Sequence, residues 1–339
     1  MSLLHRARAP LRLSFCGGGT DVSPYPEQRG GVVLSTTIDK FCYATLRPRR
    51  DRRLNIRSLD LGLVARYEHP RRIRLDGNLD LIKGVVRAAR PRLGADLSVH
   101  TDAPPGSGLG ASSTLVVALL TVLGHWQGRA RTDYEVAELA YRIERQDLGI
   151  AGGRQDQYAA TFGGFNFIEF HKDVTVVNPL RVRPDVALEL EYRLLLCYVG
   201  RTRFSGHIIE RQVAAYRRGH PATLQALDGL KSLTFAMKSA LLRGRVDELG
   251  DLLDAAWQHK RRLEEHISSD ELDELYARAR RAGALGGKMP GAGGGGYFFF
   301  IAAAGRKQQV AEALRRAGAQ LVPVSFSTTG AVAWSAPRG

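Results

Sequence analysis

The feature that most constrains this chain is a glycine-rich loop between a strand-like segment and an apolar helix. Residues 95–101 alternate in polarity as a β-strand does, and residues 112–123 form an unbroken apolar stretch of helical length. Between them, Gly106, Gly108 and Gly110 allow positive φ angles and a close approach of backbone N–H groups to a ligand. The unpaired amides and the positive dipole end of the following helix favour an anion at the same point. The pattern therefore predicts a cradle for nucleotide phosphates.

Two better-known phosphate-binding patterns do not fit this loop. Its G-x-G-x-G spacing differs from the G-x-G-x-x-G of dinucleotide folds. No G-x-x-x-x-G-K-[ST] pattern occurs in the sequence, because Gly287-Lys288 is followed by Met289. Taken alone, the loop could be a tight turn with a serine that caps the helix. Ser112 and Ser113 lie in the predicted first helical turn, where a hydroxyl could also reach a phosphate or a metal ion.

Composition limits the class of protein without selecting a function. The 339 residues are enough for two packed domains, and 44% hydrophobic with 24% charged residues is ordinary for a globular protein. No apolar run is long enough to cross a bilayer, and residues 1–10 lack the apolar segment of a signal peptide. Cys16, Cys42 and Cys197 are too few and too widely spaced for a disulfide framework or a zinc site. We therefore expect a cytoplasmic protein with no membrane partner.

The net charge of +15 is compatible with several anionic partners. However, the basic residues are spread along the chain, and clusters such as residues 47–53 are interrupted by an acid or flanked by turn residues. We interpret most of the arginines as solvated surface residues, with anion binding as the alternative.

The pattern along the chain indicates an α+β protein in two closely packed halves. In residues 1–187 we expect strands at 11–15, 32–46, 53–57 and 95–101, helices at 80–90 (capped by Asn78 or Asp80), 112–123 and 133–146, and a hairpin of 165–170 with 174–177. In residues 188–339 we expect strands at 194–199, 297–301 and 320–326, and helices at 207–219, 222–242, 246–266, 270–282 and 306–317. The glycine-rich stretch 291–296 separates two of these elements.

Three spaced motifs then point to a known family. Pro104 to Ser113 resembles the second motif of the GHMP kinases, which include galactokinase, homoserine kinase, mevalonate kinase and phosphomevalonate kinase. Residues 9–12 with 17–21 resemble the first motif, and residues 288–295 resemble the third. The resemblance covers nearly the whole chain. It implies a two-domain GHMP kinase fold, with a ribosomal-protein-like N-terminal domain over 1–187 and a ferredoxin-like C-terminal domain over 188–339, and it implies ATP and Mg²⁺.

Within that superfamily, three segments resemble the D-glycero-D-manno-heptose 7-phosphate kinases: Gly17 to Asp21, Gly152 to Tyr158, and the glycine run 291–296. L-fucose kinases and an octose 7-phosphate kinase are near neighbours. The first motif departs from the G-E-H-x-D form of galactokinase, which argues against free galactose as the substrate. The resemblance implies transfer of a phosphoryl group to the anomeric (C1) hydroxyl of heptose 7-phosphate, giving the 1,7-bisphosphate. The alternative substrates are an octose 7-phosphate and L-fucose.

The resemblance also implies roles for individual residues. Asp156 matches the catalytic aspartate, which could orient or accept the proton of the attacking hydroxyl; its alternative is a helix N-cap. Arg12 matches a basic residue that lies near this aspartate and could stabilise charge on the transferring group. Ser112 and Glu144 match ligands of Mg²⁺, and without the motif Glu144 would be an exposed helix carboxylate.

The remaining assignments concern ATP and the sugar. Asp21 resembles a ligand of sugar hydroxyls, and Arg203, after a buried strand, could clamp a substrate phosphate or could be a surface arginine. Lys288 with the glycines after it could form a loop that closes on the substrate and the phosphate cradle. The phosphates are assigned to Pro105, Gly106, Ser107, Gly108, Leu109, Gly110, Ala111, Ser112 and Ser113. The sugar is assigned to Gly18, Gly19, Thr20, Asp21, Gly153, Gln155, Arg203, Lys288, Gly291, Gly293 and Gly294.

An RNA-binding protein is the rival hypothesis from another class, because the N-terminal fold is ribosomal-protein-like and the charge is basic. RNA binding predicts aromatic residues interleaved with basic ones, a pattern that the sequence does not show. It also gives no role to Glu144 or Asp156. We therefore expect a phosphorylated sugar as the partner and no nucleic acid, and we leave open a homodimer.

Overall fold

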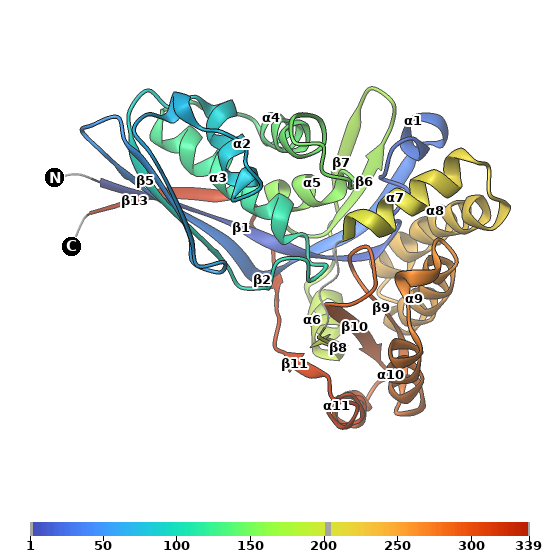
Figure 1. Ribbon diagram of the computed structural model, residues 1–339. Helices are drawn as coiled ribbons and strands as arrows, with labels where there is room; N and C mark the ends of the chain where they lie inside the picture. Colours follow the sequence, from blue (N-terminus) through green and yellow to red (C-terminus); the bar gives the residue numbers. More distant parts are fainter. Residues whose placement is uncertain (1–2, 201–204, 338–339) are drawn as a thin grey trace.

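The computed structural model describes residues 3–200 and 205–337, which form two β-sheets with helices packed on them (Figure 1). The larger sheet has nine strands and the smaller has four. All strand pairs are antiparallel except that of β3 with β5. The α+β architecture expected from the sequence is confirmed.

The larger sheet is organised around two long strands, β1 (Leu3–Cys16) and β2 (Gly31–Pro48). Its strand order is β13-β1-β2-β5-β3-β4, and β2 also pairs with β6 and β12. The register of β1 against β2 shifts between Pro10 and Arg12 and again between Ser14 and Cys16. Such irregularities bend a strand and redirect its side chains. The other strands are β3 (Leu54–Ser58), β4 (Leu63–Tyr67), β5 (Ala95–Thr101), β6 (Asn166–Phe170), β7 (Thr175–Pro179), β12 (Phe326–Ser327) and β13 (Val332–Pro337).

Helices α2 to α5 cover one face of this sheet (Figure 1). The apolar helix predicted after the glycine loop is α3 (Ala111–Trp126), which packs against β1 and β2. It is flanked by α2 (Asp80–Ala89), α4 (Asp133–Tyr141) and α5 (Gln155–Phe162). A capping box between Thr132 and Glu135 begins α4, as the Thr132–Asp133 pair predicts. Short turns complete this part: α1 (Tyr25–Arg29), η1 (Pro70–Arg72) and the π-helical η2 (Arg142–Asp147).

The smaller sheet has the order β11-β8-β10-β9 and a core rich in aromatic residues. Phe298 and Phe300 of β10 are fully buried, and the Phe298 ring lies 5.0 Å from that of Trp257. The strands are β8 (Leu194–Tyr198), β9 (Ala284–Lys288), β10 (Tyr297–Ala302) and β11 (Gln320–Val322). The helices of this half are α6 (Pro184–Arg193), α7 (Ser205–Arg217), α8 (Pro221–Leu242), α9 (Val246–Arg261), η3 (Glu265–Ile267), α10 (Asp270–Arg281) and α11 (Lys307–Arg316).

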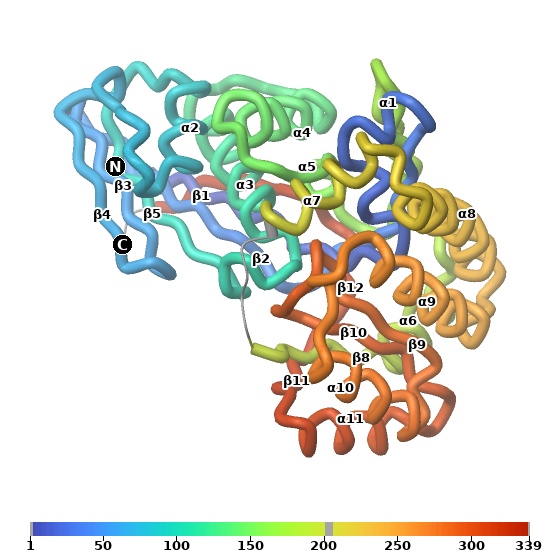
Figure 2. The backbone as a smooth tube through the Cα atoms, turned by 45° about the vertical axis from the view of Figure 1, so that its right-hand side comes forward, coloured from blue at the N-terminus to red at the C-terminus, as the bar shows by residue number. Residues whose placement is uncertain are grey.

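Helices α7 to α9 connect the two halves. Figure 2 shows α7 and α8 beside α1, with α9 leading from there towards β9. Tyr25 of α1 donates a hydrogen bond to Asp228 of α8, and Tyr216 of α7 donates one to Gln28 of α1. No helix within residues 3–200 and 205–337 is long and apolar enough to cross a membrane.

Several predicted elements differ from those in the structure. The helix expected over 246–266 ends at Arg261, and the strand expected over 320–326 is two strands, β11 and β12, in different sheets. Strand β9 was not predicted, because its sequence Ala-Leu-Gly-Gly-Lys has little strand character. Its glycines have a packing reason: a Cβ on Gly286 would lie 2.1 Å from the carbonyl oxygen of Gly250 in α9. Strands β4 and β13 and helix α6 are further elements that the sequence pattern does not predict.

The proposed division at residues 187 and 188 stays a prediction. That position lies inside α6. After β11 the chain returns to the larger sheet, where β12 pairs with β2 and β13 pairs with β1. The larger sheet is therefore built from both ends of the sequence.

Candidate active site

The three sequence motifs and the turn before α5 meet in one cleft between the two sheets. Contacts between backbones hold its loops together: the amide of Arg12 donates to Leu109 O, and the amide of Tyr297 donates to Ser107 O. The cleft is lined by loop residues after β1, by the glycine loop before α3, by residues 150–156, by the end of α9 and by the glycine run after β9.

The glycine loop has the conformation that its sequence predicts. Gly106, Gly108 and Gly110 have φ angles of 75°, 89° and 80°, in the region that side-chain-bearing residues avoid. Gly110 is also the residue before α3, so the N-terminus of that helix opens directly on the cleft. The unpaired amides of the helix and its dipole favour an anion there, so the loop could hold a phosphate. No serine side chain caps the helix, which removes the alternative of a plain serine-capped turn.

Arg12 and Asp156 form an ion pair at the centre of the cleft. The Nε of Arg12 lies 2.8 Å from Oδ1 of Asp156, and its Nη1 donates to Gly108 O at 2.5 Å. Arg12 is only 3% exposed. Helix α5 begins at Gln155, so Asp156 lies within its first turn and is not the N-cap that the alternative interpretation expected. One guanidinium thus connects β1, the glycine loop and the carboxylate of α5.

Glu144 lies in the π-helical turn η2, and its carboxylate points inward. It is fully buried and accepts hydrogen bonds from Ser112 Oγ (3.2 Å) and from Gln157 Nε2 (2.6 Å). Ser112 lies in the first turn of α3, next to the phosphate loop. A hydroxyl and a carboxylate oxygen on one wall of the cleft form the kind of donor set that Mg²⁺ accepts. The alternative of an exposed helix carboxylate does not hold, because the Glu144 side chain is fully buried and lines the cleft.

Asp21 organises the turn before α5. Its Oδ2 accepts from the amides of Arg154 (3.0 Å) and Gln155 (3.1 Å), and its Oδ1 accepts from the amide of Gly19 (3.0 Å). Gly153 is required by the same contact, because a Cβ there would lie 2.0 Å from Asp21 Oδ2. The carboxylate lines the cleft but has its charge largely satisfied by backbone amides.

The third motif contributes a glycine loop to the cleft, whereas its lysine is buried outside that loop. Gly291 touches the phosphate loop so closely that a Cβ on it would lie 2.5 Å from the Cα of Gly108. Lys288 belongs to β9, not to the loop, and it is 1% exposed. It donates to Ser14 O at 2.8 Å and does not line the cleft. Burial lowers the pKa of Lys288 to about 8.

Most of the site residues predicted from the sequence line the cleft. These are Arg12, Gly18, Gly19, Asp21, Gly106, Gly108, Gly110, Ala111, Ser112, Ser113, Glu144, Gly153, Gln155, Asp156, Gly291 and Gly293. The others lie elsewhere: Thr20 is buried and bonded to Gly17 O and Val32 O, Leu109 is in the core, and Ser107 lies behind the loop. Pro105 and Gly294 line neighbouring pockets. Arg203 lies outside the described residues.

The cleft also contains residues that the sequence analysis missed. Lys260 at the end of α9, Gln212 of α7 and Arg145 of η2 all line it. They lie outside the three motifs, in helices whose composition is ordinary, so the sequence carried no signal for them apart from their charge or polarity.

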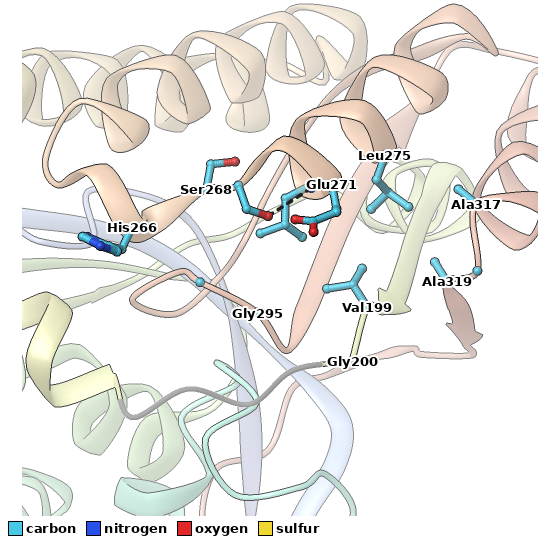
Figure 3. Close-up of a pocket in the computed structure, with 13 residues that line it drawn as sticks. Val199, Gly200, His266, Ser268, Glu271, Leu275, Gly295, Ala317 and Ala319 are labelled. Atoms are coloured by element: carbon cyan, nitrogen blue, oxygen red, sulfur yellow. Dashed lines mark hydrogen bonds between the residues drawn. The ribbon is translucent and has the colours of Figure 1, made fainter.

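Two further pockets adjoin the cleft. A mostly apolar pocket shares Ala111 and Ser112 with it and could hold a flat base beside the phosphate loop; its other walls are Ser58, Asp60, Leu61, Leu79, Leu81, Ile82, His100, Thr101, Pro105 and Leu115. The second lies beside the 291–296 loop, where Gly295 faces Ser268 and Glu271 of the α10 region and Val199, the residue after β8 (Figure 3). Among the described site residues that the sequence predicts, only Gly294 lines this second pocket. We therefore assign the chemistry to the cleft.

Comparison with known proteins identifies the class of site. The chain matches the GHMP kinases N terminal domain over residues 80–164 and the GHMP kinases C terminal domain over residues 237–320. The D-glycero-alpha-D-manno-heptose 7-phosphate kinase of Campylobacter jejuni is 39% identical over 97% of this chain and 98% of its own length. A crystal structure of a D-glycero-D-manno-heptose 1-phosphate kinase from Bacteroides thetaiotaomicron has a TM-score of 0.83 and 34% identity, covering 98% and 100% of the two chains. The bifunctional fucokinase/GDP-fucose pyrophosphorylase of Arabidopsis thaliana is 27% identical over 85% of this chain and 29% of its own.

These matches cover both halves of the fold and all the loops of the cleft. The chain belongs to the GHMP kinase family, as its three motifs predict. More particularly, it is a sugar kinase of that family, a phosphotransferase with an alcohol group as acceptor, and GHMP kinases use ATP.

The buried Lys288 gives a prediction about stability. Its pKa is about 8 in the folded protein against an ordinary value of 10.5, so the folded state binds fewer protons than the unfolded state between these values. The burial penalty is fully present below pH 8 and is relieved as the pH rises towards 10.5. The free energy of unfolding of the wild type, minus that of Lys288→Met, should therefore rise by at most about 3 kcal/mol over this range.

Chemical denaturation of both proteins at a series of pH values measures this difference. Subtracting the variant removes the contribution of groups that do not interact with Lys288, such as Cys42 and Cys197, whereas Cys16 and Lys260 interact with it and stay in the difference. If the difference in free energy of unfolding between the two proteins does not change between pH 7.5 and 10.5, the pKa of Lys288 is not lowered in the folded protein.

Proposed function

We propose that this kinase transfers the γ-phosphoryl group of ATP to the anomeric hydroxyl of D-glycero-D-manno-heptose 7-phosphate, giving the 1,7-bisphosphate. The observation that carries the proposal is the Arg12–Asp156 pair between the phosphate loop and the Asp21 turn, in a chain 39% identical to a heptose 7-phosphate kinase over nearly its full length. The names of the two similar heptose kinases differ in the phosphate position, 7 for one and 1 for the other. The carbon that receives the phosphate, which we take to be C1, is therefore part of the proposal. We also propose that the reaction takes place in the cytoplasm.

Asp156 and Arg12 would act on the attacking hydroxyl. Oδ1 of Asp156 is engaged by Arg12, which leaves Oδ2 to accept the hydrogen bond of the hydroxyl and orient it towards the phosphate. An anomeric hydroxyl is more acidic than an ordinary alcohol, so a carboxylate of modest basicity suffices. Arg12 donates to the phosphate loop as well, and its remaining N–H groups could stabilise charge on the transferring group.

Ser112 and Glu144 fit a Mg²⁺ ion, because their oxygens lie together on the cleft wall next to the phosphate loop. Ser112 and Glu144 would hold the ion, and a divalent cation at this place would supply neutralisation of the phosphate charge. Gln157 would keep the Glu144 carboxylate in place, since it donates to Oε2 and leaves Oε1 on the side of Ser112.

The sugar would lie on the other side of Asp156, against the turns at 18–21 and 153–155. Gln155 donates to Asp21, and its own Oε1 has no hydrogen-bond partner within the described part of the chain. A buried acceptor without a partner is costly, and a sugar hydroxyl would satisfy it. We propose Asp21 mainly as the group that holds this turn, and Arg203 as a ligand of the remote phosphate.

A panel of sugars tests the substrate. Purified protein with ATP and Mg²⁺ should turn over heptose 7-phosphate with a higher kcat/KM than an octose 7-phosphate, L-fucose or galactose. Phosphorus NMR of the product should show a new phosphate on C1. A preference for L-fucose would replace the substrate within the same enzyme class, and phosphate on another carbon would overturn the anomeric assignment.

Asp156→Asn tests the proposed catalytic aspartate. The amide cannot accept a proton, so kcat should fall at least about 100-fold while ATP still binds. Steady-state kinetics gives kcat, and calorimetric titration with ATP and Mg²⁺ gives the affinity. Near-normal turnover by the folded variant would remove Asp156 from this role.

Glu144→Gln and Ser112→Ala test the proposed metal site. Each removes an oxygen ligand near the phosphates, so each should raise the Mg²⁺ concentration needed for half-maximal activity. Activity measured against Mg²⁺ at fixed ATP gives this value. An unchanged Mg²⁺ dependence in both variants would show that the ion binds elsewhere.

A further inference from the structure

Lys260 is a cleft residue that no motif contains. It lies in the last turn of α9, is 5% exposed and forms part of the cleft wall. Its Nζ donates to Met289 O at 2.8 Å and also to Gly291 O. An ammonium group has three N–H donors, so these two carbonyls leave one donor unassigned. Lys260 therefore fixes the start of the glycine loop and keeps a donor to spare.

The charge of Lys260 is not balanced by a carboxylate. No Asp or Glu of residues 3–200 and 205–337 forms an ion pair with it. The carboxylates of the cleft have other partners: Asp156 pairs with Arg12, Glu144 accepts from Ser112 and Gln157, and Asp21 accepts from backbone amides. Burial, together with repulsion from Lys288 and Arg12, lowers the pKa of Lys260 well below its ordinary value, against a smaller attraction from Asp21 and Cys16.

A structural latch alone does not need this charge. Two backbone carbonyls can be satisfied by a neutral donor, whereas burying an unpaired cation is costly. The cost is recovered if an anion enters the cleft, since an opposite charge at short range favours the ammonium form. A buried lysine in a kinase cleft that has no carboxylate partner among the described residues thus indicates a place for a negatively charged ligand.

The position of Lys260 indicates that this anion is a phosphate group. Gly291, which Lys260 holds, lies in backbone contact with Gly108 of the phosphate loop. Gly108 in turn accepts from Arg12, the partner of Asp156. The ammonium is therefore anchored where the two glycine loops meet, within electrostatic reach of Arg12. Phosphate oxygens held by the glycine loop, on which charge develops as the phosphoryl group leaves ATP, would lie beside it.

We propose that Lys260 is a catalytic residue whose ammonium binds an oxygen of the phosphoryl group in transit while its other two donors hold the 289–291 backbone against the phosphate loop. The inference rests on the phosphoryl transfer proposed above but not on the identity of the sugar. It assigns to Lys260 the position in the cleft that the sequence analysis gave to Lys288.

Three variants of Lys260 separate the effect of its charge from the effect of its hydrogen bonds to the 289–291 backbone. Lys260→Gln keeps N–H donors for the carbonyls but removes the charge, Lys260→Met removes both, and Lys260→Arg keeps both. Lys172→Gln, on the exposed turn between β6 and β7, is the matched control. With the panel sugar that the wild type uses best, Lys260→Gln and Lys260→Met should both lose at least about 100-fold in kcat, whereas the arginine variant should retain more activity than either.

A binding measurement adds a readout that anchoring alone would not change. ADP and Mg²⁺ with aluminium fluoride, a mimic of the phosphoryl group in transit, should raise the melting temperature of the wild type more than ADP and Mg²⁺ do. Lys260→Gln should lose this increment and keep the ADP effect. If Lys260→Met does not fold, the glutamine variant decides the question.

A kcat of Lys260→Gln within about threefold of the wild type, or an aluminium fluoride increment that survives in it, would overturn the proposal. Failure of the proposed substrate shows itself separately, as a wild type that does not use heptose 7-phosphate. In that case the same variants are compared on the sugar that is used.

Discussion

The site depends on one buried guanidinium. Arg12 is held on β1 between two shifts of strand register, and it reaches both the carbonyl of Gly108 and the carboxylate of Asp156. A planar guanidinium holds its five donors in fixed directions, whereas the three donors of a lysine ammonium rotate on a flexible stem. Arg12 therefore sets the distance between the phosphate loop and α5. With Arg12 in place, the phosphate loop and the start of α5 are held together in one cleft.

Around that centre, the glycines are explained by contacts as well as by backbone angles. Gly153 leaves room for the Asp21 carboxylate, Gly291 lets one loop lie on Gly108, and Gly286 lets α9 lie on β9. At each of these positions a Cβ would fall 2.5 Å or less from another atom. Close approach of backbones is what allows four short segments from distant parts of the sequence to form one small cleft.

The sequence was sufficient for the glycine loop, its helix, the order of most elements and the pairing of Arg12 with Asp156, because local spacing and motifs carry those features. It was not sufficient where tertiary packing decides. The sequence places Lys288 in a loop that closes on the substrate, yet β9 buries it away from the cleft, and Lys260 lines the cleft from a helix with no motif. The return of β12 and β13 to the larger sheet is a long-range pairing that no local pattern reveals.

The π-helical turn at 142–147 has a consequence for the length of the chain in this region. A π turn holds one more residue than an α-helical turn, so it is wider and the flanking helical segments keep their faces. Deleting a single residue from the segment would let it become ordinary α-helix, and each residue of the turn that moves by one position would change direction by about 100°. Glu144, which lies within the turn, would then lose its inward position even though the helix itself survived. In this segment the number of residues is constrained more strictly than the identity of most of them, and related sequences should tolerate substitutions here far better than gaps.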